Sequence, residues 1–61
     1  MAAIDDIINL FGYLPSQKEF CAWLHENELE GKAAKYLLIQ VAEANNEEPD
    51  ADCIKSLVPD E

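Results

Sequence analysis

The sequence predicts an all-α protein, a small single-domain bundle of three to four short helices over residues 1–61. Apolar residues recur at the three-and-four spacing of a helical face, and capping residues, glycine and proline stand where such helices would begin and end. Threonine is absent, valine occurs only at Val41 and Val58, and no alternating apolar and polar run is bounded by hairpin residues. We therefore expect helices and no strands.

The first two helices are expected at about residues 3–13 and 17–26. The first has one apolar stripe, formed by Ile4, Ile7, Ile8, Phe11 and Leu14. Gly12 is a left-handed cap near its end, and Pro15 prevents smooth continuation. Ser16 and Glu19 have the spacing of a capping box, in which each residue satisfies an amide of the other. The apolar side of the second helix is formed by Phe20, Trp23 and Leu24.

The third and fourth helices are expected at about residues 29–45 and 49–57. Asn27 and Glu30 repeat the capping spacing, so the chain should break near Asn27. Pro49 fits the first turn of the last helix, where its missing amide costs nothing, and Pro59 ends that helix. The alternative is one continuous helix over residues 17–44, which would leave three helices.

The third helix has an unusually wide apolar surface. Tyr36 and Ile39 lie off its main apolar stripe, which consists of Ala34, Leu37, Leu38 and Val41. Such a helix is central in its own fold, or it contacts a second molecule.

Acidic residues dominate the charge of the chain. There are 13 acids, four lysines and no arginine, which gives a net charge of −9, and the C-terminal third from Glu43 to Glu61 is the most negative part. This charge repels a phosphate backbone and an anionic membrane, so we expect neither direct nucleic-acid binding nor membrane binding. It favours fast encounter with a basic surface, including that of a protein that itself handles nucleic acid.

Location and cysteine chemistry follow from what the chain does not contain. No apolar run approaches the roughly 18 to 20 residues that cross a bilayer, and acids stand between Met1 and Asp6 where a signal peptide carries base. We therefore expect a cytoplasmic protein in which Cys21 and Cys53 are reduced, buried thiols rather than a disulfide.

No residue constellation indicates catalysis, and we expect no enzyme, no metal and no cofactor. The string His25, Glu26 begins like the zinc-protease helix motif, but Leu29 stands where that motif needs its second histidine. Cys21 and His25 lie one helical turn apart, yet a nucleophile also needs a pocket and an oxyanion site. Asp50 and Asp52 resemble the start of a calcium loop that has no glycine at its sharp turn.

The remaining function is a non-catalytic acidic protein-binding module, an inhibitor or adaptor that docks on a basic surface of a larger protein. One alternative is a homodimeric structural or accessory subunit that assembles through apolar helix faces, and a second is a helix-turn-helix-like regulator. Trp23 is either the centre of the core or an interface anchor. The candidate partner-binding residues are Glu26, Glu28, Glu30, Glu43, Glu47, Glu48, Asp50, Asp52, Trp23 and Tyr36.

Overall fold

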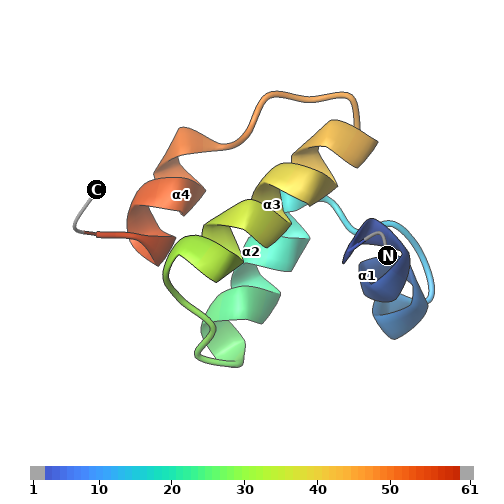
Figure 1. The fold of residues 1–61 in the computed structure, drawn as a ribbon, viewed down its shortest axis with the longest axis horizontal. Coiled ribbons are helices and arrows are strands. Elements are labelled where there is room, and N and C mark those ends of the chain that lie inside the picture. Colours follow the sequence, from blue (N-terminus) through green and yellow to red (C-terminus); the bar gives the residue numbers. More distant parts are fainter. Residues whose placement is uncertain (1–2, 60–61) are drawn as a thin grey trace.

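The computed structural model describes residues 3–59 and consists of four helices joined by short connections (Figure 1). They are α1 (Ala3–Phe11), α2 (Gln17–Glu26), α3 (Lys32–Ala44) and α4 (Ala51–Leu57). No strand occurs within these residues, and the predicted all-α class is confirmed. The three-helix alternative is wrong, because residues 27–31 separate α2 from α3.

Local signals in the sequence explain the bounds of α1 and α2. Helix α1 ends at Phe11, before the expected residue 13, because Gly12 adopts a φ of 81° and its amide donates to the carbonyl of Ile8 at 2.8 Å. Helix α2 has the expected bounds, and the Ser16 hydroxyl accepts from the amide of Glu19 at 3.1 Å. The Glu19 carboxylate accepts a hydrogen bond from the Tyr13 hydroxyl, a partner outside the capping box.

The expected start of the third helix is wrong. Asn27 does not begin a helix; it ends α2, with its amide donating to the carbonyl of Trp23 at 3.1 Å. The next residue, Glu28, takes a left-handed φ of 56°, and the amide of Leu29 donates to the carbonyl of Leu24 at 2.9 Å. The bond from Leu29, together with the bond from the amide of Glu28 to the carbonyl of His25 at 3.1 Å, forms the Schellman arrangement that closes a helix, and α3 begins only after Gly31.

The same closing arrangement ends α3. Asn46 has a φ of 58°, and the amide of Glu47 donates to the carbonyl of Ala42 at 2.9 Å. Helix α4 then begins after Asp50, whose carboxylate accepts from the amide of Asp52 at 3.0 Å. Pro49 therefore precedes the helix and does not occupy its first turn, because Asp50 supplies the cap.

Helix α3 is the centre of the fold, as its wide apolar surface predicts. It contacts each of the other three helices, and Figure 1 shows it in front of α2, with α1 and α4 to either side. Its buried side chains are Ala34, Leu38, Val41 and Ala42. They pack in one core with Ile7, Phe20, Leu24, Cys53 and Leu57.

The two cysteines form a disulfide between α2 and α4, so the expectation of reduced thiols is wrong. Cys21 and Cys53 are 32 residues apart in the sequence, but the contact between α2 and α4 brings their Cα atoms to 6.3 Å. That separation is ordinary for a disulfide. Cys53 is buried in the core and Cys21 is half-buried beside it.

Two expectations from the sequence concern the ends of the chain. Asp60 and Glu61, which belong to the acidic C-terminal third, and Met1 in the segment compared with a signal peptide lie outside the described residues. Within the described part, no helix combines the length and the apolar character that crossing a bilayer requires.

Candidate functional site

The candidate acids form two sets in the described part of the chain. Glu26, Glu28 and Glu30 lie at and after the end of α2, next to the start of α3, and all are exposed. The second set, here called the acidic connection, begins on the last turn of α3, follows the segment that leads to α4 and ends in the first turn of α4. It consists of Glu43, Glu47, Glu48, Asp50 and Asp52, all exposed. Helix α3 separates the first set from the start of the acidic connection, which then runs back across the molecule to α4 (Figure 1).

One side chain of α2 holds the acidic connection in place. The amide nitrogen of Gln17 donates to Glu47 Oε1 at 3.0 Å and to the backbone carbonyl of Glu48 at 2.9 Å. Its amide oxygen accepts from the backbone amide of Asp50 at 2.8 Å. Asn45 adds a bond from its Nδ2 to the carbonyl of Pro15 at 3.0 Å. The connection is thus fixed to the start of α2, although its carboxylates are exposed.

Nothing in the sequence pattern selects Gln17 for this task. It stands at the first position of a helix, where glutamine is common, and its partners are about 30 residues away. Only the position of the α3–α4 connection over the start of α2 brings these groups together.

The two aromatic candidates have different surroundings. Trp23 is half-buried and belongs to an aromatic cluster, with its ring centroid 5.6 Å from Phe11 and 5.7 Å from Phe20, the latter stacked. The core interpretation of Trp23 therefore has direct support. Tyr36 is 60 % exposed on α3 and makes no part of that cluster.

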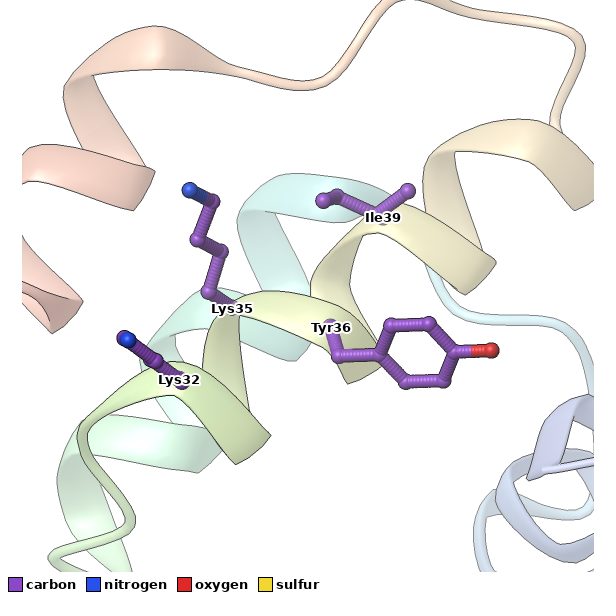
Figure 2. Close-up of a pocket in the computed structure, with 4 residues that line it drawn as sticks. All are labelled: Lys32, Lys35, Tyr36 and Ile39. Carbon is purple, nitrogen blue, oxygen red and sulfur yellow. The ribbon is translucent and has the colours of Figure 1, made fainter.

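Tyr36 borders a shallow hollow on the outer surface of α3. The hollow has a volume of about 230 Å³ and is lined by Lys32, Lys35, Tyr36 and Ile39. Figure 2 shows the Tyr36 ring extending to one side of α3 and the two lysine amines to the other. An adjoining hollow of about 290 Å³ shares Lys35 and continues over α4 along Ile54, Lys55 and Val58. Three of the four lysines therefore line adjoining hollows on one surface of an acidic chain, a grouping that the linear sequence does not predict.

A third hollow, of about 190 Å³, lies among α1, α2 and α3. Its lining includes Trp23, Phe20 and two exposed leucines, Leu10 and Leu29, with Asp6 at the rim. The partly buried Trp23 reaches the surface in this hollow.

The structure joins His25 to Ser56, a combination that nucleophilic catalysis would need. His25 Nε2 lies 2.9 Å from Ser56 Oγ, while Ser56 Oγ donates to the carbonyl of Cys53 at 2.7 Å. The tautomer of His25 sets whether Nε2 donates to Ser56 Oγ, whose proton is then directed to the Cys53 carbonyl, or accepts from it. This contact joins α2 to α4. Cys21, the other nucleophile near His25, is held in the disulfide.

The described residues contain no group of three histidine, cysteine, aspartate or glutamate side chains arranged to hold a metal ion. Comparison of the chain with protein-family models, with curated proteins and with solved structures finds no match.

Proposed function

We propose that the protein is a non-catalytic protein-binding module, an inhibitor or adaptor that docks its acidic connection on a basic surface of a larger protein. A protein that grips nucleic acid offers such a surface. The observation that supports this proposal is the set of three hydrogen bonds that Gln17 makes to Glu47, Glu48 and Asp50, here called the Gln17 clamp. The clamp holds the backbone of a run of exposed carboxylates in one conformation.

A clamped acidic segment suits binding better than a free one. Exposed carboxylates speed the encounter with a basic partner, and the net charge of −9 extends that attraction beyond the contact itself. A segment that is already ordered loses less conformational entropy when it binds. Segment 43–52 itself contains five acids and no lysine, and Lys35 and Lys55 lie beside its Pro49 and Ala51.

The helix-turn-helix-like alternative has weaker support. Helices α2 and α3 are consecutive and in contact, as that motif requires, but α3 presents only Lys32 and Lys35 as bases. A reader of duplex DNA neutralises several phosphates, and here the surrounding acids oppose that attraction. The expectation of a cytoplasmic protein also has weaker support. It is based in part on reduced cysteines, whereas a disulfide such as Cys21–Cys53 is typical of oxidising compartments.

The test is capture of partners on the immobilised chain, elution with increasing salt, and identification by mass spectrometry. Each partner is then titrated against two variants of equal net charge. Glu48→Gln/Asp52→Asn removes charge from the acidic connection, and none of the hydrogen bonds described above uses these two carboxylates. Glu26→Gln/Glu30→Gln removes the same charge at the other end of α3. We expect the first variant to bind about tenfold more weakly and the second to bind almost normally.

Gln17→Ala tests the clamp without changing the charge. It should weaken binding several-fold, because the acidic connection is then ordered only on docking. Equal effects of the two charge variants would contradict the proposal, since net charge alone would then explain capture. Retention of duplex DNA by the wild-type chain at ordinary ionic strength would favour the helix-turn-helix alternative.

A further inference from the structure

The outward surface of α3 carries the pattern of a helix-pairing seam. Ala34, Leu38 and Val41 face the core, and the stripe on the opposite side is Lys32, Tyr36, Ile39 and Glu43. The spacing of this stripe alternates four, three and four residues, which is the spacing of the a and d positions in a coiled coil. Its middle is apolar, with Tyr36 60 % exposed and Ile39 half-buried, and its two ends carry opposite charges.

The hollow on this surface has the geometry of a coiled-coil hole. Its four lining residues, Lys32, Lys35, Tyr36 and Ile39, stand at the first, fourth, fifth and eighth positions of an eight-residue span (Figure 2). Four residues at that spacing form the diamond into which one side chain of a facing helix inserts. The hollow is therefore shaped to receive a side chain from a second helix.

We propose that the second helix is α3 of another copy of this chain. The two helices pack antiparallel through their outward stripes, and the two-fold axis crosses the stripe at the level midway between residues 37 and 38. In this register Ile39 of each copy enters the hollow of the other. Tyr36 then faces Ile39, and Lys32 faces Glu43 at both ends of the pair. The stripe is self-complementary, as a two-fold interface requires.

The charges on the stripe select a second copy in this direction. A parallel pair would place Lys32 against Lys32 and Glu43 against Glu43, whereas the antiparallel pair turns both contacts into attraction. The adjoining hollow over Ile54 and Val58 extends the apolar surface beside the seam. A standard interface covers about 800 Å² of each partner, roughly a fifth of this chain's 4174 Å².

The net charge of −9 on each copy opposes association, and salt screens this long-range repulsion more than it weakens pairs in contact. Dimerisation should therefore be strongest at moderately high salt. This inference does not depend on the proposed function, because the purified chain is its own partner.

Sedimentation of the purified chain from about 10 μM to about 1 mM in about 0.5 M NaCl tests the pairing through a charge swap. Lys32→Glu and Glu43→Lys each place like charges at both ends, so each variant alone should dimerise about thirtyfold more weakly than the wild type. An equimolar mixture of the two variants restores opposite charges at both ends. It should form a heterodimer about as tight as the wild-type homodimer.

Misfolding cannot imitate this result. Lys32 is the first residue of α3 and Glu43 lies in its last turn, so each substitution places the charge that the helix dipole prefers at that end. Lys18→Glu, on the exposed surface of α2, makes the same charge change away from the seam and should leave dimerisation intact. A wild-type chain that stays monomeric up to about 1 mM overturns the proposal. Tighter pairing of Lys32→Glu alone overturns the antiparallel register, and so does a mixture that stays monomeric.

Discussion

Loss of the Cys21–Cys53 disulfide should remove a large part of the stability of this domain. The bond closes a loop with a sequence separation of 32 residues. The loop entropy that it removes from the unfolded chain corresponds to about 3–4 kcal/mol. A domain of 61 residues has a total unfolding free energy of about 3–9 kcal/mol. Reduction should therefore lower the melting temperature by about 25–30 °C and leave a substantial unfolded population near 37 °C.

The measurement compares urea unfolding of the oxidised chain, the reduced chain and a Cys21→Ala/Cys53→Ala variant, followed by circular dichroism. Alanine is preferred to serine because Cys53 is only 6 % exposed, and a buried hydroxyl would add its own penalty. Both the midpoint and the slope are needed, since the cross-link makes the unfolded chain more compact and lowers the slope. Reduction changes no residue, so agreement between the reduced chain and the variant isolates the effect of the bond.

Two results would refute this reasoning. One is coincidence of the unfolding curves of the oxidised and reduced chains. The other is rapid alkylation of both cysteines in the native protein without reductant, which would mean that the thiols are free in spite of the contact between α2 and α4.

Three further predictions concern single positions. Glu28→Gly should raise the free energy of unfolding by about 0.5–1 kcal/mol in chemical unfolding, because the φ of 56° strains a residue with a side chain but not glycine. Equal stability of Glu28→Gly and Glu28→Ala would argue against backbone strain at this position. Leu38→Ala removes a side chain with 0 % exposure and should lower the free energy of unfolding by about 3–5 kcal/mol. Leu10→Ala, at a position with 62 % exposure, should lower it little. Similar losses of stability in the two variants would contradict the assigned core. The pKa of Tyr13 is raised above 10.0, chiefly by its hydrogen bond to Glu19, then by desolvation and by repulsion from that carboxylate. The stability from this bond is present below the ordinary pKa of tyrosine and is lost as pH rises through the raised value. In Glu19→Gln, spectrophotometric titration should show the pKa of Tyr13 returning toward 10.0. An unchanged pKa of Tyr13 in that variant would contradict the bond.

The sequence predicts the elements of this fold better than their contacts. Ser16 and Gly12 act through neighbours within four residues, and both are at the ends expected for them. Asn27 is predicted to begin a helix, but it ends α2, because asparagine is found at either end of a helix. The helix ends there because Glu28 adopts a left-handed conformation, which glutamate disfavours and which the sequence therefore does not indicate. Pro49 is misplaced by a similar local competition, in which Asp50 is the better cap.

The long-range features are beyond the reach of a single sequence, for one physical reason. The disulfide and the Gln17 clamp depend on which helices lie side by side, and the periodicity of each helix does not contain that information. The third helix is the instructive intermediate case. Its wide apolar surface indicated a central position or a second molecule, and the contacts of α3 confirm the central position. Tyr36 and Ile39, the two residues off the main stripe, remain on the outward surface after the core is complete.

The two proposals together predict a bivalent module, and one variant separates pairing from charge. In the antiparallel dimer, Glu43 of one copy lies level with Lys32 of the other, so the two acidic connections begin about 17 Å apart along the helix axis. A dimeric or repetitive basic partner could engage both at once and gain avidity, whereas an isolated basic site could not. Lys32→Glu adds negative charge, which by itself strengthens attraction to a basic surface. Lost pairing would therefore be shown by three results together. Lys32→Glu captures a multivalent partner more weakly and binds an isolated basic site as well as the wild type does. Mixing it with Glu43→Lys restores capture of the multivalent partner. Stronger capture of both partners by Lys32→Glu would show that only charge matters and that the module binds as a single copy.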